Sequence, residues 1–420
     1  MLERRSFLLD WLANLGSLGL LALSGILINS IIAKYYGATA LGIFNQVVAV
    51  YILGSQLATM GTQFSVLRYM AAFSGRPEEH GTILCSALVV AAGAATFVVA
   101  LGFFVFVWAG LSFYSEAVAA GVVIMLPGLW CFAINKVLLN ALNGLRRNRL
   151  FAAFTGLRYV LMSLGIVAAT VAGCRDYQLS IILTVSESIL MIGLIIACVR
   201  LLAGSKLAVQ RAWIRRHASF GLRSILGGVA VELNTRVDVL ILGAFTSDAA
   251  VGIYSFAAFF VEGILQLPQI SRRIVDPNLT ALVARRDAQE LGAFMRKGRN
   301  LAVAFMLAVT VISGALYPLF ATLLADRQIA AESWSVFLIL MVGACVFGTY
   351  ATFSGVFSQA GLPAAQSRFN VMMLATNTVL NFALVPKFGV DGAAVATSVS
   401  FVLGTAYFRA MVAKHIAVRF

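Results

Sequence analysis

The stretch VELNTRVDVLILGAFTSDAAVGIY (Val231–Tyr254) shows how the chain is organised. Its last five residues, AVGIY, match ALGIF (Ala40–Phe44), which lies 210 residues earlier in a chain of 420. The apolar runs that lead into the two motifs, INSIIAKYYGA and DVLILGAFTSD, match as well. A repeat of half the chain predicts two halves of the same design and the same orientation, as in transporters built from parallel repeats.

The composition indicates a membrane protein. Hydrophobic residues make up 61% of the chain and charged residues 11%, whereas a soluble domain carries about 25% charged residues. Apolar runs of about 20 residues span a bilayer as helices, so we expect an all-α polytopic membrane protein. We predict twelve spans, at residues 11–33, 41–61, 82–108, 117–135, 151–172, 178–202, 222–246, 251–271, 301–324, 333–357, 368–386 and 391–413.

Six spans return the chain to the side of the membrane on which it began. The repeat therefore predicts two parallel six-helix lobes, at residues 1–203 and 222–420, joined by a basic cytoplasmic linker at residues 204–221. The net charge of +14 fits this topology, because 25 of the 31 Lys and Arg residues fall on the cytoplasmic side if both termini are cytoplasmic. Positive-inside topology thus explains the basicity, and we expect no nucleic-acid partner.

Metal and cofactor chemistry have no support in the sequence. The 5 cysteines lack CxxC spacing, and the 3 histidines lie far apart. No phosphate-binding loop of the form G-x-x-x-x-G-K-[ST] is present, so ATP hydrolysis within the chain is not indicated. We expect no catalytic residue, no metal and no cofactor.

Polar residues recur at matching places in the two halves. Spans 1, 2, 7 and 8 each carry a stripe of polar side chains at helical spacing, which predicts that these four helices face a shared hydrated cavity. The alternative is that the amides and hydroxyls hold helices together. The candidate cavity residues are Asn14, Ser24, Gln56, Gln63, Glu232, Asn234, Arg236, Asp238, Glu262 and Gln266.

Charges inside the spans distinguish the second half from the first. The six are Arg158, Glu187, Glu232, Arg236, Asp238 and Glu262. Counterparts of the last four, 210 residues earlier, are Ala22, Ile26, Ile28 and Ile52. The fold therefore does not require these four charges. Because a charge near the bilayer centre costs about 2.5–3.5 kcal/mol, they are candidates for a functional role.

Two regions of the second half carry a resemblance to a known family. They are NTRVDVLILGAFTSDAAVGIYSFAAFFVEGILQLPQI (234–270) and NVMMLATNTVLNFALVPKFGVDGAAVATSVS (370–400), and KYYGATALGIFNQVVAVYILGSQLATMGTQFSVLRYMA (34–71) fits too. The chain resembles the polysaccharide transporter family, of the O-antigen flippase type, in the multidrug/oligosaccharidyl-lipid/polysaccharide (MOP) exporter superfamily. One departure is that lipid II flippases carry arginines on the first span, whereas this chain has none there after Arg5.

The resemblance implies a MATE/MOP-like transporter, not an enzyme, with two lobes that open alternately to either side. It would export undecaprenyl-diphosphate-linked oligosaccharide, an O-antigen, exopolysaccharide or capsule unit, across the bacterial inner membrane. The partners implied are the lipid-linked oligosaccharide, membrane lipids, a proton or sodium ion, and polysaccharide polymerase and export proteins. Two alternatives are an ion-coupled multidrug exporter of the same superfamily and a membrane glycan polymerase or ligase. Polymerases and ligases of this kind need a large external loop for their catalytic residues, and the predicted external loops are short.

The resemblance suggests roles for the charges. Arg236 is a candidate ligand of the diphosphate, because guanidinium has a planar fork; alternatively, it pairs with Glu232 one turn earlier. Asp238, Glu262 and Glu187 are candidates for ion coupling, since a carboxyl away from water can exchange a proton in each cycle.

The remaining arginines lie nearer the cytoplasm in the predicted topology. Arg158 is close enough to that end of its span to extend to the aqueous boundary. At the predicted cytoplasmic mouth, Arg68, Arg272 and Arg273 are candidates for capturing an anionic headgroup, although positive-inside topology explains them equally.

Overall fold

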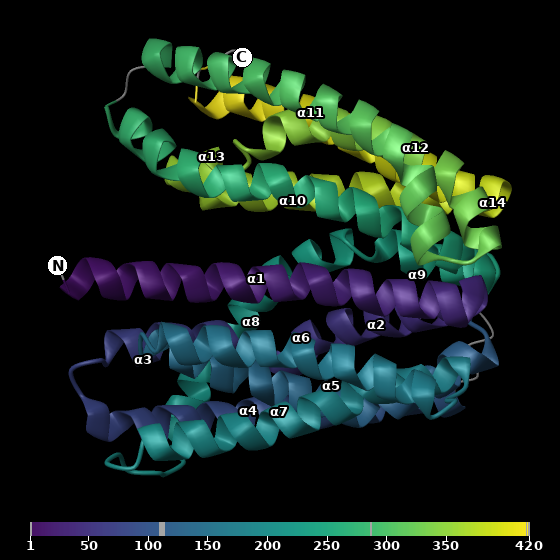
Figure 1. Ribbon diagram of the computed structural model, residues 1–420. Coiled ribbons are helices and arrows are strands. Elements are labelled where there is room, and N and C mark those ends of the chain that lie inside the picture. Colours follow the sequence, from purple (N-terminus) through teal and green to yellow (C-terminus); the bar gives the residue numbers. More distant parts are fainter. Residues whose placement is uncertain (1, 109–113, 286–287, 417, 419–420) are drawn as a thin grey trace. The chain divides into compact units, whose positions relative to one another are not determined.

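The computed structural model describes the backbone of residues 2–108, 114–285, 288–416 and 418, and their side chains except those of 2–15, 17, 18, 226–228, 273, 274 and 288. All regular secondary structure in these ranges is helical (Figure 1). The prediction of an all-α protein is confirmed.

Long apolar helices dominate the described ranges. Nine segments there are apolar and long enough to cross a bilayer: Gly37–Thr59, Pro77–Trp108, Glu116–Gly144, Asn148–Val171, Asp176–Leu201, Asp248–Arg272, Gln289–Leu324, Arg327–Gln359 and Pro363–Ile416. A shorter apolar helix covers Gly19–Tyr35. The chain is a multi-pass membrane protein, as its composition predicts, and the count of twelve spans stays a prediction.

The last of these segments contains two predicted spans. Helix α14 (Pro363–Ile416) has 54 residues and is interrupted at Gly389, whose φ of 54° and ψ of −127° are not helical. Glycine adopts this backbone without the steric cost that a Cβ brings. Gly389 lies between the predicted spans at 368–386 and 391–413, so the interruption falls where the sequence predicts a connection.

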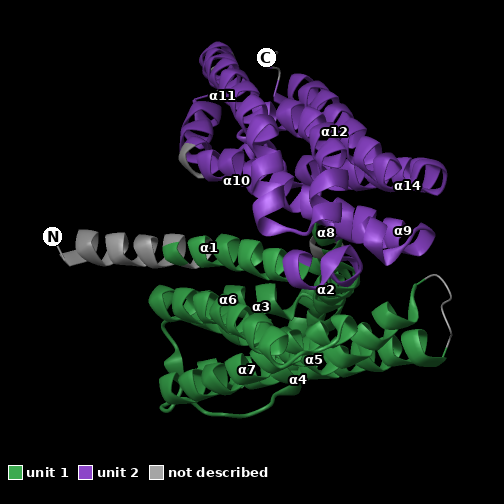
Figure 2. Cartoon of the chain, turned by 45° about the vertical axis from the view of Figure 1, so that its right-hand side comes forward, with its two compact units in different colours: residues 1–32, 43–232 green, residues 33–42, 233–420 purple. Residues whose placement is uncertain are grey.

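The helices form two compact units (Figure 2). Unit 1 comprises Met1–Ile32 and Ile43–Glu232, and unit 2 comprises Ala33–Gly42 and Leu233–Phe420. These units are defined by packing, whereas the predicted lobes are defined by the repeat. The lobe boundaries therefore stay a prediction.

Unit 1 is built around helix α5, which packs against α3, α4, α6 and α7. Small residues bring these helices close: a Cβ on Gly128 of α5 would lie 2.6 Å from the Cα of Thr184 in α7. Trp213 of α8 joins the buried apolar cluster formed by α3, α4, α5 and α7. The helices that lie wholly or mostly in this unit are α1 (Leu2–Tyr35), α2 (Gly37–Thr59), α3 (Thr62–Ala72), α4 (Pro77–Phe103), η1 (Phe104–Trp108), α5 (Glu116–Gly144), α6 (Asn148–Val171), η2 (Asp176–Ser180), α7 (Ile181–Leu201) and α8 (Arg211–Asn234).

Unit 2 is built around helix α12, which packs against α10, α11 and α14, while α9 packs against α14. Its aromatic core includes Tyr317 of α11 stacked on Phe337 of α12, with ring centroids 4.1 Å apart. Besides α14, the helices are α9 (Val237–Phe245), α10 (Asp248–Ala284), α11 (Ala288–Leu324), α12 (Arg327–Ala351) and α13 (Val356–Gln359).

The two copies of the repeated motif meet within unit 2. A Cβ on Gly42, in the first turns of α2, would overlap the backbone oxygen of Asp248 in α10. A Cβ on Gly252 would in turn overlap the backbone oxygen of Ala38. The glycine that ALGIF and AVGIY share therefore lets two helix starts cross at backbone contact.

The predicted span at 222–246 is divided. Helix α8 ends at Asn234, residues 235 and 236 form a turn, and α9 begins at Val237 after Arg236, whose φ is −133° and ψ is −5°. The expectation of one continuous helix over 222–246 is wrong, and Asn234 and Asp238 lie on different helices. Asn and Thr compete with helical hydrogen bonds through their own side chains, which explains a break at Asn234–Thr235.

Candidate functional site

Arg236 forms an ion pair with Glu262 of α10, with Nη1 and Oε1 3.7 Å apart. Both side chains are partly exposed, by 25% for Arg236 and 45% for Glu262. The buried Nε of Arg236 has no hydrogen-bond acceptor among the described residues. The break between α8 and α9 places this guanidinium at a helix start, and Gln266, one turn beyond Glu262 on α10, is exposed.

Asp238 lies buried in the first turn of α9. Its Oδ2 accepts a hydrogen bond from the hydroxyl of Tyr254, and its Oδ1 accepts one from the backbone N–H of Val239 at 2.9 Å. The Tyr254 hydroxyl also lies 3.2 Å from Oγ1 of Thr397 in α14. Asp238 is thus enclosed by hydrogen-bonding groups of unit 2.

Tyr254 was not predicted as a site residue, although the repeat distinguishes it from its counterpart in the first half. The residue 210 positions before it is Phe44, and the residue 210 positions before Asp238 is Ile28. Both members of the buried pair therefore replace apolar residues of the first half.

In unit 1, Arg158 and Glu187 form a buried ion pair, with Nε and Oε1 2.7 Å apart. Asn135 of α5 donates to Oε2 of Glu187 at 2.7 Å and to the backbone oxygen of the same residue at 2.9 Å. The expectation that Arg158 extends to the aqueous boundary is wrong, because a carboxylate within the unit binds its guanidinium. Asn135 was not predicted as a partner.

Lys136 is a further charge that the sequence did not place within a span. Helix α5 continues to Gly144, beyond the predicted end at 135, so that Lys136 lies inside it. Its ammonium donates to Oγ of Ser55 at 2.7 Å and lies 4.6 Å from the ring centroid of Phe132. The guanidinium of Arg158 lies 4.6 Å from the same centroid, so one ring contacts both cations.

The predicted polar stripes are partly brought together. In unit 1, Gln56 donates to Oε1 of Glu232 at 2.9 Å and accepts a hydrogen bond from Gln63 at 3.3 Å. Ser24 instead contacts α6: it donates to the backbone oxygen of Tyr159 at 3.0 Å and accepts from Ser163 at 2.8 Å.

Three further predicted residues complete the set. Asn234 is half-buried, and its Oδ1 has no partner among the described residues. The side chains of Asn14 and Arg273 lie outside the described residues.

The family of the chain follows from a direct comparison. A sequence model described as "Polysaccharide biosynthesis protein" matches residues 7–270, well over half of the chain. The chain belongs to the polysaccharide biosynthesis protein family.

Two relatives from Haloferax volcanii support this assignment. The chain is 32% identical to "Probable flippase AglR" over 174 residues, and these residues are 40% of this chain and 36% of the relative. It is 22% identical over 200 residues to "Probable low-salt glycan biosynthesis flippase Agl15", which is 47% of this chain and 42% of the relative. The match thus spans less than half the length of either relative.

Solved structures show the fold of the chain. It matches "Lipid II flippase MurJ, inward closed conformation" with a TM-score of 0.77 and 15% identity, covering 97% of this chain and 87% of that one. It matches an inward-facing multidrug resistance MATE transporter of the MOP superfamily with a TM-score of 0.74 and 13% identity, covering 94% of each chain. The predicted MATE/MOP-like fold is confirmed.

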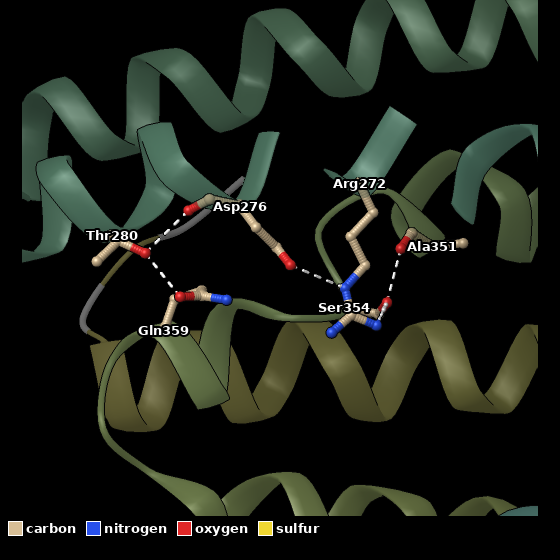
Figure 3. A network of polar contacts seen from close by, with 6 residues as sticks. All are labelled: Arg272, Asp276, Thr280, Ala351, Ser354 and Gln359. Atoms are coloured by element: carbon tan, nitrogen blue, oxygen red, sulfur yellow. Dashed lines mark hydrogen bonds and ion pairs between the residues drawn. The ribbon is translucent and has the colours of Figure 1, made fainter. Parts of the chain in front are cut away.

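The arginines predicted to lie at the cytoplasmic mouth have different partners in the two units. In unit 2, Arg272 pairs with Asp276, with Nε and Oδ2 3.2 Å apart, and its Nη1 lies 3.5 Å from Oγ of Ser354 (Figure 3). Thr280 donates to Gln359 at 2.6 Å in the same network. In unit 1, Arg68 has no acidic partner among the described residues and stacks on Phe220, with its Cζ 5.3 Å from the ring centroid.

Proposed function

We propose that the protein is a flippase that moves a lipid-linked oligosaccharide across the membrane. Membership of the polysaccharide biosynthesis family carries this proposal. The relatives named as flippases and the fold shared with a lipid II flippase support it. Transport by alternating access needs no covalent chemistry, so the protein acts as a transporter and not as an enzyme.

Arg236 is the proposed ligand of the substrate's diphosphate. Its guanidinium is partly exposed, and one of its nitrogens lacks an acceptor among the residues that the structure describes. The separation of 3.7 Å from Glu262 is longer than a charge-assisted hydrogen bond of about 2.8 Å. A diphosphate can therefore displace this carboxylate at modest cost, because phosphate oxygens satisfy the guanidinium fork better. Arg236 would then alternate between Glu262 and the substrate.

The carboxyls are the proposed sites of ion coupling. Glu262 would lose its cationic partner whenever Arg236 binds the substrate, so a proton or a sodium ion would replace the arginine there. Asp238 is enclosed by Tyr254 and Thr397 and would respond to movement of α9. Glu187 is bound by Arg158 and Asn135, which favours a structural role unless that ion pair opens during transport.

The cellular setting completes the proposal. The substrate is an oligosaccharide, such as an O-antigen, exopolysaccharide or capsule unit, on undecaprenyl diphosphate. The protein lies in a bacterial inner membrane with both termini in the cytoplasm, in keeping with the charge distribution. Polysaccharide polymerase and export proteins would receive the product.

A second candidate function is the export of small molecules. The TM-score of 0.74 to a multidrug transporter and the partly exposed Glu262 favour it. The two functions differ in cargo: a flippase acts on a lipid with a large anionic headgroup, and a multidrug exporter acts on soluble or membrane-dissolved cations.

Deleting the gene in its host and identifying what accumulates separates the two functions. A flippase predicts that a diphosphate-linked glycan builds up on the cytoplasmic side and that surface glycan falls at least tenfold, with both restored by the wild-type gene. Unchanged surface glycan together with increased drug sensitivity would support the exporter instead.

A further inference from the structure

Helices α3 and α8 of unit 1 line an open cavity of about 500 Å³. Pockets for small ligands range over about 300–1,000 Å³. The cavity is lined mainly by basic and aromatic side chains: Arg68, Tyr69, Arg215, Arg216, Phe220 and Arg223.

The basic residues of the cavity share one side of α8. Arg216, Phe220 and Arg223 are spaced by four and three residues, and Arg215 and Ser219 line the same cavity at the adjoining positions. Residues three and four apart on a helix are neighbours on its surface. The sequence RAWIRRHASFGLR (211–223) thus builds a stripe of arginines, to which α3 adds Arg68.

The four arginines have no acidic partner among the described residues. Arg68 stacks on Phe220 and Arg216 lies 4.7 Å above Trp213, while Arg223 donates to Ser219 at 2.7 Å. Two arginines of unit 2, by contrast, pair with carboxylates: Arg272 with Asp276 and Arg285 with Glu290. Four arginines around one cavity, without an acidic partner in the described ranges, leave guanidinium donors available for an anion. Positive-inside topology explains why arginines are frequent on this side, but it does not require them to cluster around a cavity.

Contacts beside the cavity hold α3 against α8. Ser65 of α3 and Nδ1 of buried His217 in α8 lie 2.5 Å apart, and Tyr69 packs edge-on against Trp213 with ring centroids 5.3 Å apart. A Cβ on Gly221 would overlap the backbone oxygen of Met60, so α8 touches the turn that precedes α3 at backbone contact. A cavity fixed in this way loses little conformational entropy when it binds a ligand.

We propose that the α3–α8 pocket binds the diphosphate group of a lipid. Planar guanidinium forks bind phosphate oxygens in pairs, so four arginines match a diphosphate. Exposed apolar side chains adjoin them: Phe64, one turn before Arg68, is 42% exposed, and Leu222, beside Arg223, is 59% exposed. These would contact a prenyl chain that a soluble diphosphate lacks. That this lipid is the substrate of the flippase rests on the proposed function. In that case the pocket is a capture site separate from Arg236.

Equilibrium binding to the purified full-length protein in a neutral detergent tests the pocket. The probes are farnesyl diphosphate, inorganic diphosphate and farnesol, measured by titration calorimetry. The test variant is Arg216→Gln/Arg223→Gln, and the matched control is Arg146→Gln/Arg147→Gln, which removes two exposed arginines from the α5–α6 turn of the same unit.

The expected result is that farnesyl diphosphate binds the wild type at least tenfold more tightly than either other probe. The test variant loses at least tenfold in affinity, and the control stays within twofold. Arg216→Lys/Arg223→Lys falls between them, because it keeps the charge and loses the fork; it also serves if the glutamine variant does not fold.

Three results would overturn the assignment. If the control variant loses as much affinity for farnesyl diphosphate as the test variant, the ligand is attracted by positive charge in general. If both pocket variants bind like the wild type, the ligand binds elsewhere. If inorganic diphosphate binds as tightly as farnesyl diphosphate, the ligand is not a lipid. The binding experiment does not depend on transport, so the two proposals can fail separately. If the pocket binds farnesyl diphosphate but deletion of the gene leaves surface glycan unchanged, the flippase function is refuted and the pocket is not.

Discussion

Gly42 and Gly252, the glycines of the two repeated motifs, lie against each other where α2 and α10 cross in unit 2. Each would place a Cβ onto a backbone oxygen of the other helix. Packing explains why both copies of the motif carry a glycine at this position, because any larger residue would separate the first turns of α2 and α10.

Gly252→Ala should therefore destabilise the protein. Overpacking of this kind costs about 1–3 kcal/mol or more, because the obstructing atoms are backbone and cannot rotate away. The midpoint of thermal unfolding in detergent should fall by several degrees. Gly263→Ala in the same helix is the control, since nothing lies within 4 Å of its Cβ, and it should raise the midpoint slightly or leave it unchanged. Equal midpoints for the two variants would show that the crossing is loose.

The repeat, the all-α class and the membrane location could be predicted because they depend on periodicity and average polarity. The break after Asn234 could not, because a hydropathy average over about 20 residues merges the polar residues from Glu232 to Asp238 into one apolar run. The length of α5 was missed for a related reason: Lys136 ends the apolar run but not the helix, because Phe132 and Ser55 bind its ammonium.

Partners of the buried charges were harder to predict than the charges themselves. The sequence favours pairs one helical turn apart, such as Glu232 with Arg236, whereas Arg236 pairs with Glu262, 26 positions away on another helix. Which helices adjoin is set by tertiary packing, and no local pattern encodes it. A comparison of the two halves could have predicted Tyr254 as a partner of Asp238, because both residues stand where the first half has apolar residues, Phe44 and Ile28.

Removing either member of the Arg158–Glu187 pair should be strongly destabilising. Loss of one partner leaves the other charge buried and alone, at a cost of about 3–5 kcal/mol. We expect Arg158→Met and Glu187→Gln each to lower the folded yield and the thermal midpoint, and the double variant to recover part of the loss. The exposed pair of Arg76 and Glu79 is the control: Arg76→Met should change stability by less than about 1 kcal/mol. Additive losses in the buried pair would argue against direct coupling.

Arg236→Ala should abolish export of the glycan while the protein still inserts and folds. Its charge is partly exposed and its partner carboxylate can be solvated, so the cost in stability should be small compared with that of Arg158→Met. Arg236→Lys should restore export only in part, because the ammonium lacks the fork. Surface glycan in cells that carry each variant as the sole copy provides the measurement. Normal glycan with Arg236→Ala would refute the role as ligand.

Asp238→Asn and Glu262→Gln distinguish ion coupling from structural support. If either carboxyl couples transport to an ion, the variant should lose the dependence of transport on pH or sodium. Tyr254→Phe is the matched control, because it removes a hydrogen bond from Asp238 and restores the residue type found at Phe44. It should lower the rate and leave the shape of the ion dependence unchanged. Variants of both carboxyls that keep the wild-type dependence would exclude coupling through them.

His217 should make the α3–α8 contact sensitive to acid. It lies in the part of α8 predicted to be cytoplasmic, and burial lowers its pKa to about 4, against 6.5 for an exposed imidazole. Between these values the unfolded chain binds the proton and the folded protein does not, so stability is complete above pH 6.5 and is lost as the pH falls towards 4. The full loss amounts to about 3 kcal/mol. Thermal midpoints of the wild type and His217→Gln, measured from pH 7 to pH 4, isolate this contribution: the wild type should lose more stability than the variant across the window. Parallel curves would mean that folding leaves the pKa of His217 unchanged, as it would if the imidazolium donated a hydrogen bond to Oγ of Ser65.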